Sequence, residues 1–203
     1  MLDRKSFEQA RHIFTLGAHL VDHYRISRGK CTPVGTGPGA LSPYFGPKDY
    51  SSRSVLFVAK TRLDSKGGLL LIESFKILAA RDPSVHLTIV GSEDAVRAAE
   101  GLPNITVRAF IPLPELQELF NRSALFVLPA LNEPWGLVYL EAMACRTPFL
   151  GLRKGSLPEL TLDGKLGFLL ERPDATMLAD AILDASSDAG RLERMGTDRQ
   201  SMS

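Results

Sequence analysis

Two glutamates eight residues apart, Glu133 and Glu141, are the side chains in this sequence best placed to do chemistry together. Gly136 lies between them, and a glycine lets the backbone approach a ligand closely. The free amides at the start of a helix bind anions such as phosphate, and an ionised glutamate can accept two hydrogen bonds from a cis-diol. An anion site with a carboxylate on either side is suited to a nucleotide-sugar diphosphate.

The sequence around the two glutamates predicts the elements that would position them. Residues 124–128 are an apolar run of strand length, and helical spacing of apolar residues begins near Trp135 or Gly136. A second short β-rich run follows at residues 148–150. This pattern predicts a βαβ unit in which Glu133 follows the carboxyl end of the first strand, where open α/β sheets bind their ligands.

Taken alone, the two glutamates have an ordinary explanation, because glutamate is mostly exposed on protein surfaces. Two charges at this spacing occur by chance in many helical proteins. The Glu-Pro-Trp-Gly-Leu turn between a buried strand and a helix is much less common, and it favours a ligand site over solvated surface charge.

A second group of candidates lies in the loop after a predicted strand at residues 55–59. The loop carries Lys60, Arg62 and Lys66 ahead of a predicted helix over 67–80. Cations at the carboxyl edge of a parallel sheet could neutralise the charge of a leaving diphosphate. The competing explanation is ordinary surface cations, and these residues alone do not decide between the two.

Composition narrows the class of protein. The chain has 203 residues, of which 44% are hydrophobic and 23% charged, and its formal net charge is +1, as in an ordinary globular protein. This balance gives no electrostatic case for a nucleic-acid partner or an anionic membrane. No apolar run reaches transmembrane length, and residues 1–10 are too charged for a secretory signal. We expect a cytoplasmic protein.

The sequence also lacks the patterns of several other kinds of site. Cys31 and Cys145 fall in different parts of the chain and suggest no disulfide framework; Cys145 is interpreted as a small buried residue. No cluster of histidine, cysteine and acidic residues has metal-ligand spacing, and there is no nucleophile elbow or Walker A loop. We expect no metal and no resident cofactor.

From Ser54 onward, strand-like runs alternate with helical patterns as far as Asp174, which is placed to cap a further helix. This alternation predicts an α/β fold over residues 51–203, a Rossmann-like parallel sheet between two helix layers, incomplete at its C-terminus. Residues 31–50 are dense in glycine and proline and predict a linker. Residues 1–30 contain a strand-helix piece without a partner strand nearby, which we interpret as the remainder of another domain.

The stretch Glu133-Pro-Trp-Gly-Leu-Val-Tyr-Leu-Glu141 resembles the E-x7-E motif of retaining glycosyltransferases of GT-B architecture, which have two Rossmann-like domains. The resemblance is closest to glycosyltransferase family four, and Leu-Pro-Ala before the motif and Glu-Ala-Met-Ala-Cys after it match the family too. It implies that Glu133 approaches the donor sugar, that the loop amides bind the diphosphate and that Glu141 holds the ribose hydroxyls.

The resemblance extends to three other loops. It implies phosphate-binding roles for Arg62 and Lys66, although this loop is one residue shorter than is usual in the family, which leaves Lys60 as an alternative to Arg62. The backbone at residues 110–112 would influence the choice of base. The stretch Ser156-Leu-Pro-Glu159 is similar to the loop that follows the motif, where it could contact the donor or only cap a short helix.

These resemblances define the predicted site. The catalytic residues would be Arg62, Lys66 and Glu133. The donor-binding residues would come from the motif loop, the ribose carboxylate and the loop near the base: Pro134, Trp135, Gly136, Leu137, Glu141, Phe110 and Ile111.

The resemblance implies the donor-binding half of a retaining glycosyltransferase of glycan or glycolipid biosynthesis, with a nucleotide-diphosphate sugar as donor. The acceptor would be held by an N-terminal domain of which residues 1–30 are the remainder, and we expect both ends of the chain to be truncated. By itself the chain should bind a nucleotide diphosphate weakly and transfer no sugar. Two alternatives stay open: a non-catalytic nucleotide-binding module of Rossmann-like fold, and a GT-B sugar-nucleotide epimerase.

Overall fold

The computed structural model of the chain divides into two compact units, Met1–Gly37 and Pro38–Ser203. The smaller unit contains a two-stranded sheet and the larger a six-stranded sheet. The structure describes residues 4–24, 28–37, 39–59, 62–91, 93–133 and 135–198.

The smaller unit is built on two short strands, β1 (Ile13–Thr15) and β2 (Cys31–Pro33), which pair in parallel. Helices α1 (Arg4–Gln9) and α2 (Ala18–His23) and the 3-10 turn η1 (Arg28–Lys30) accompany them. The strand of this piece therefore has a partner, which lies inside the stretch predicted as linker. Three residues are too few to show a period of two, so the sequence does not reveal β2. That the unit is the remainder of an acceptor domain stays a prediction.

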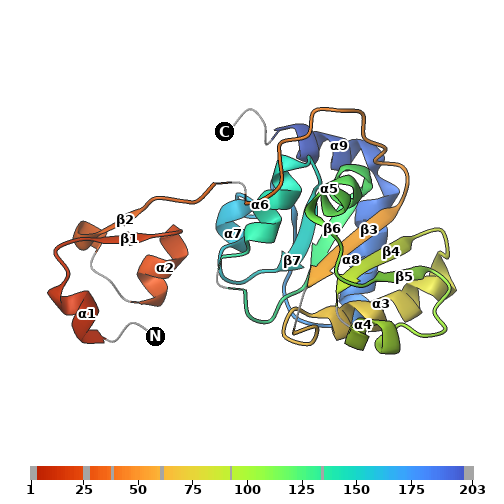
Figure 1. Cartoon of the computed structure of the whole chain (residues 1–203), viewed down its shortest axis with the longest axis horizontal. Helices are drawn as coiled ribbons and strands as arrows, with labels where there is room; N and C mark the ends of the chain where they lie inside the picture. Colours follow the sequence, from red (N-terminus) through yellow and green to blue (C-terminus); the bar gives the residue numbers. More distant parts are fainter. Residues whose placement is uncertain are drawn as a thin grey trace. The chain divides into compact units, whose positions relative to one another are not determined.

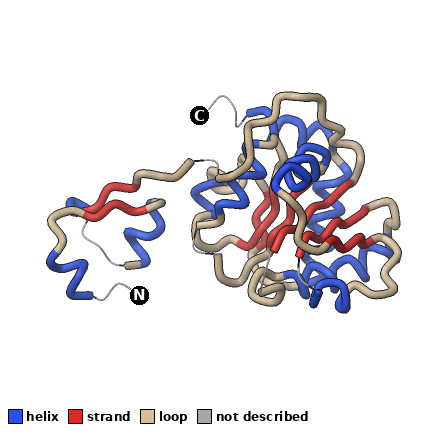
Figure 2. The backbone as a smooth tube through the Cα atoms, viewed as in Figure 1, coloured by secondary structure: helices blue, strands red, loops and turns tan. Residues whose placement is uncertain are grey.

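The larger unit is an α/β domain around one parallel sheet, which confirms the predicted fold class (Figures 1 and 2). Its strand order is β5-β4-β3-β6-β7-β8, and all five neighbouring pairs run parallel. The strands are β3 (Ser54–Ala59), β4 (His86–Gly91), β5 (Ile105–Arg108), β6 (Leu125–Leu128), β7 (Phe149–Leu152) and β8 (Phe168–Leu170).

The strand order contains a reversal of winding. The chain moves outward from β3 to β5, returns to β6 on the other side of β3, and then continues outward through β7 to β8. The loops that follow β3 and β6 therefore leave the same edge of the sheet in the middle of the domain. In open parallel sheets this switch point is where ligands bind.

Helices cover both faces of the sheet (Figure 1). Helices α3, α4 and α8 lie on one face, where α3 contacts both of the others. Helices α5, α6 and α7 lie on the opposite face, and α9 packs on α8. Their bounds are α3 (Gly68–Arg81), α4 (Glu93–Ala98), α5 (Leu113–Arg122), α6 (Leu137–Ala144), α7 (Leu157–Leu160), α8 (Ala175–Ser187) and α9 (Ala189–Asp198).

Residues that favour the start of a helix lie where two of these helices begin. Asp174 caps α8 as predicted, with its Oδ1 accepting from the Met177 amide at 2.9 Å, and Pro114 lies in the first turn of α5, where its missing N–H leaves no bond unmade. Among the residues that the structure describes, no helix combines the length and the apolar character needed to span a membrane.

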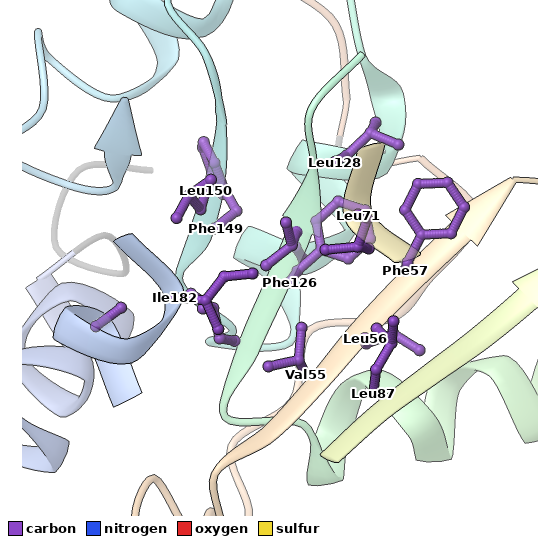
Figure 3. Close-up of a cluster of buried hydrophobic side chains, with 14 of the residues drawn as sticks. Val55, Leu56, Phe57, Leu71, Leu87, Phe126, Leu128, Phe149, Leu150 and Ile182 are labelled. Atoms are coloured by element: carbon purple, nitrogen blue, oxygen red, sulfur yellow. The ribbon is translucent and has the colours of Figure 1, made fainter. Parts of the chain in front are cut away.

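The core lies where the two helix layers meet the central strands. All four residues of β6 and all four of β7 are buried, and Figure 3 shows side chains of both strands, Phe126, Leu128, Phe149 and Leu150, in the buried cluster. On the face that α6 covers, the ring of Tyr139 packs 5.9 Å from that of Phe126 and 5.0 Å from that of Phe149. Strands covered on both faces become continuous apolar runs in the sequence, which is why they could be predicted.

A segment of residues 39–50, here called the strap, runs along α6 and belongs to the larger unit. Leu41 is 3% exposed and joins the core. The Tyr44 amide donates to the Ala144 carbonyl at 2.9 Å, and the Tyr50 hydroxyl donates to the Arg146 carbonyl at 2.9 Å. The strap occupies most of the predicted linker, but its contacts are those of an integral part of the domain.

Lys48 fastens the strap. Its Nζ donates to the carbonyls of Phe120 at 2.7 Å, Asn121 at 3.1 Å and Cys145 at 3.3 Å, and to the Thr147 hydroxyl at 2.9 Å. The carbonyls at the ends of α5 and α6 lack helical partners and carry partial negative charge, so one ammonium group satisfies both helix ends. Burial lowers the pKa of Lys48 to about 7. Cys145, in the same region, is fully buried as predicted, and burial raises its thiol pKa to about 11.

Lys48 should make stability depend on pH. Its pKa is about 7 in the folded protein, against the ordinary value of 10.5 that applies to the unfolded chain. Between these values the unfolded state binds one more proton than the folded state, so stability rises with pH, by at most about 1.4 kcal/mol per pH unit. Urea unfolding of the parent and of Lys48→Met at pH 7, 8 and 9 should show the parent gaining stability relative to the variant. Lys76→Met, at an exposed lysine on α3, is the control; an equal slope in all three proteins would contradict the prediction.

Candidate functional site

The loops after β3 and β6 touch at the switch point of the sheet. The Leu131 amide donates to the Ser65 carbonyl at 3.0 Å. Gly67 has a φ of +77°, and a Cβ there would lie 2.2 Å from the Pro129 carbonyl oxygen. Only a glycine can bring these two backbones so close, because any side chain would overlap a carbonyl that cannot move freely. The two loops are thus held as one surface.

Lys66, Glu133 and Gly136 converge on this surface. The Lys66 ammonium forms an ion pair with Glu133 Oε2, and the two side chains are 28% and 17% exposed. Glu133 Oε1 accepts from the Gly136 amide at 3.0 Å. One carboxylate therefore lies between a cation and a backbone donor at the beginning of α6. A cation and an amide that bind a carboxylate in this way can also bind the oxygens of another anion, such as a phosphate.

Buried groups behind this surface fix the motif loop. Gly136 is the N-cap of α6 with a φ of +77°, and a Cβ there would lie 2.3 Å from the Tyr139 ring. The Tyr139 hydroxyl donates to the Leu128 carbonyl at 2.7 Å, and burial raises the pKa of Tyr139 so that it stays a donor. The Ser156 hydroxyl donates to the carbonyl of Trp135, which is 7% exposed. The loop that begins α7 thus supports the motif loop from behind.

Glu141 lies apart from this group, in the middle of α6. It is half-buried, and its Oε1 accepts from the Ala40 amide of the strap at 3.1 Å. It lies five positions after Gly136, a helical rise of about 7.5 Å. The two carboxylates of the motif therefore do not contact the same atoms, but they could contact two parts of one extended ligand.

Phe110 and Ile111 follow β5, at the same edge of the sheet. Phe110 is 73% exposed and Ile111 is half-exposed. Because β5 is three strands away from β6, this loop lies about 15 Å from the one that carries Glu133. The structure does not bring these two residues into the Lys66 group, and they could reach only the far end of a ligand bound there.

The other residues predicted for the site make no direct contact with the Glu133 carboxylate among the described residues, or lie outside them. Arg62 has an exposed side chain and a φ of +61°, and its carbonyl accepts from the Lys66 amide at 3.1 Å. It shapes the loop, while Lys66 makes the direct contact with Glu133. Leu137 is 49% exposed at the start of α6. Pro134 and Lys60 lie outside the described residues, so their predicted roles stay predictions.

Comparison with known proteins identifies the family. Residues 46–202 match the family model described as glycosyl transferases group 1. The chain belongs to this family. It is 31% identical over 197 residues to a D-inositol 3-phosphate glycosyltransferase of Paenarthrobacter aurescens, covering 87% of this chain and 48% of the relative. It is 31% identical over 158 residues to a GDP-mannose-dependent alpha-(1-6)-phosphatidylinositol monomannoside mannosyltransferase of Mycolicibacterium smegmatis, covering 71% and 41%.

Solved structures support the GT-B assignment of the fold. The Anabaena protein HepE, crystallised with UDP and glucose, superposes with a TM-score of 0.76 at 18% identity, covering 98% of this chain and 61% of HepE. The match to this chain spans less than half the length of each of the two relatives named above. The activity of a whole enzyme is therefore a matter for proposal.

The amino-acid sequence does not reveal that the strap is part of the candidate site. The contact between the Ala40 amide and Glu141 joins residues 101 positions apart and involves a backbone donor, which every residue type except proline supplies. Lys48 lies between Pro47 and Asp49, where its charge resembles ordinary surface charge. The available signal was weak: glycines at 35, 37 and 39 indicate turns but give no tertiary partner.

Two glycines with the same φ of +77°, Gly67 and Gly101, allow the contact between the two loops to be tested. At Gly67 a Cβ would overlap the Pro129 carbonyl, whereas at Gly101 it would meet nothing within 4 Å. Gly101→Ala should lose only the conformational preference, about 1–2 kcal/mol, and Gly67→Ala should lose at least about 1 kcal/mol more because of the overlap. Thermal or urea unfolding of both variants measures the difference. Equal losses would show that the two loops separate without penalty.

Proposed function

We propose that this chain is the donor-binding part of a retaining glycosyltransferase that uses a nucleotide-diphosphate sugar. The observation that carries the proposal is the convergence of Lys66, Glu133 and the Gly136 amide at the switch point of the sheet. Membership of the group 1 family supports a transferase. Retention of configuration and assignment to glycosyltransferase family four are proposed from the spacing of Glu133 and Glu141.

The proposed chemistry begins with loss of the diphosphate. The bond between the anomeric carbon and the diphosphate oxygen breaks while the hydroxyl oxygen of the acceptor bonds to that carbon; negative charge develops on the leaving diphosphate, and the proton of the acceptor hydroxyl passes to it. Lys66 and the amides at the start of α6 would bind that charge, which lowers the barrier because these groups are already in place. Glu133 would then accept hydrogen bonds from the hydroxyls of the sugar, and the exposed side chain of Arg62 would add a second positive charge.

The rest of the donor would extend along the edge of the sheet. In this proposal Glu141 accepts hydrogen bonds from the ribose hydroxyls, and the loop of Phe110 and Ile111 lies near the base. Trp135 and Leu137 would line the diphosphate side of the pocket. HepE was crystallised with UDP, and the M. smegmatis relative is named as dependent on GDP-mannose. We therefore propose a uridine or guanosine diphosphate sugar as donor.

Other parts of the proposal concern what lies outside this chain. The acceptor would be bound by an N-terminal domain, consistent with relatives more than twice as long as the matched part.

In the described part of the chain, no group of histidine, cysteine and acidic residues could hold a metal ion. We propose that the leaving charge is bound by protein groups without a resident metal or cofactor, and that the enzyme is cytoplasmic.

Nucleotide titration and sugar transfer test the function together. UDP and GDP should be titrated calorimetrically into the 203-residue chain, and transfer from UDP- and GDP-sugars should be compared with that of the full-length enzyme. We expect weak binding of at least one nucleotide and no transfer by the chain alone, because transfer needs donor and acceptor held in one geometry. Transfer near the full-length rate would show that the site is complete in these residues. Binding without turnover even in the full-length protein would favour a non-catalytic module.

Lys66→Ala tests the proposed diphosphate contact. Hydrogen bonds to charged groups contribute about 1.5–3 kcal/mol, so the nucleotide affinity should fall by roughly 10- to 150-fold. Lys76→Ala is the matched control, since Lys76 is an exposed lysine of α3 paired with Glu73, and its affinity should equal that of the parent. Calorimetry in low salt measures both. An unchanged affinity in Lys66→Ala would return this lysine to the class of ordinary surface cations.

A further inference from the structure

Glu141 is held by the strap, through a backbone contact that the motif does not include. The Ala40 amide donates to Glu141 Oε1 at 3.1 Å. Gly39 lies against the same side chain, where a Cβ would be 2.7 Å from Glu141 Cγ and 2.8 Å from Oε1. Gly39 also has a φ of +85°, which disfavours any other residue. Two independent requirements thus place a glycine next to this carboxylate.

The donor of this contact is itself fixed in place. Leu41, the next residue, is buried in the core, and the Ser42 amide donates to Gln117 Oε1 at 2.8 Å. Farther along, Lys48 holds the strap against the ends of α5 and α6. The Ala40 amide is therefore presented from a packed segment, so it can orient Glu141.

The contact leaves the carboxylate able to bind a ligand. A free glutamate side chain on a helix surface samples several rotamers, and binding must fix one of them at an entropic cost. An ionised carboxylate has about four acceptor positions, and the Ala40 amide occupies one of them. The remaining positions suffice for the two hydroxyls of a cis-diol, so the amide can orient the group without blocking it.

We propose that Gly39 and Ala40 are positioning residues that set the Glu141 carboxylate for the ribose of a nucleotide. This inference rests on the proposed function, because it takes the ribose diol as the ligand of Glu141. It adds that the segment directly following the smaller unit determines how well the donor site recognises ribose. Neither residue touches the reacting atoms in this proposal.

Discrimination between ribose and deoxyribose tests the proposal. UDP, 2′-deoxy-UDP, GDP and 2′-deoxy-GDP should be titrated into the 203-residue chain and into Gly39→Ala. For the nucleotide that binds, the parent should prefer the ribose form by about tenfold, as for a hydrogen bond to a charged group. In Gly39→Ala this preference should fall below about twofold, because the ribose form loses more affinity than the deoxy form, which has only its 3′ hydroxyl to offer Glu141. A general structural defect would weaken both forms equally.

Matched variants sharpen the result. Gly37→Ala is the control, because a Cβ at Gly37 meets nothing within 4 Å, and it should keep the full preference. In a Glu141→Ala background, Gly39→Ala should cause no further change, because the side chain that it disturbs has been removed. Ala40→Pro removes the amide donor by a different change, and it provides the same test if Gly39→Ala does not fold.

The outcomes separate this inference from the proposed function. If the parent binds neither nucleotide, the proposed function fails and the inference fails with it. If the parent prefers ribose and loses the preference in Glu141→Ala but keeps it in Gly39→Ala and Ala40→Pro, only the positioning role is overturned. If either strap variant binds the ribose form more tightly than the parent, the strap competes with ribose for Glu141, and that also overturns the proposal.

Discussion

The close approach of two backbones, at Gly67 and Pro129, is the constraint on which the rest of the site depends. The winding of the sheet reverses between β3 and β6, so the loops after these strands leave side by side. The missing side chain at Gly67 allows them to touch. Lys66, next in sequence, is thereby brought to Glu133 across 67 positions of sequence. Without that approach the domain would keep its sheet but have no convergent charges.

The carboxylates of the site have partners within the protein. Glu133 occupies the cation and the amide that would otherwise attract an anion, and Glu141 is bound to the strap. This arrangement keeps partly buried charges paired, since an unpaired charge in such a place is costly. In the proposed function a diphosphate replaces Glu133 at Lys66, which frees that carboxylate for another partner. The ion pair of Lys66 with Glu133 and the proposed contact of Lys66 with a diphosphate are thus alternatives of similar chemistry.

The sequence predicts those parts of the molecule whose cause is local. The buried strands are apolar runs, Asp174 is an N-cap with its helix behind it, and the spacing of Glu133 and Glu141 places the first before α6 and the second in the middle of that helix. The contact between Lys66 and Glu133 required the topology as well, because it depends on which strands are neighbours. The strap could not be predicted: its contacts use backbone amides and helix-end carbonyls, which carry no residue-type signal, and β2 is too short to show a period.

The role of Lys48 affects where a shorter version of this domain can begin. The family match begins at residue 46 and the first strand of the large sheet at Ser54, so either position would look like a natural start. A fragment beginning at Ser54 would lack the Lys48 ammonium that binds the carbonyls at the ends of α5 and α6, and it would expose the surface that Leu41 covers. A fragment beginning at residue 46 would retain Lys48 but lose Gly39 and Ala40. A fragment of the domain that keeps both the Lys48 contacts and the contact that orients Glu141 must therefore begin no later than residue 39.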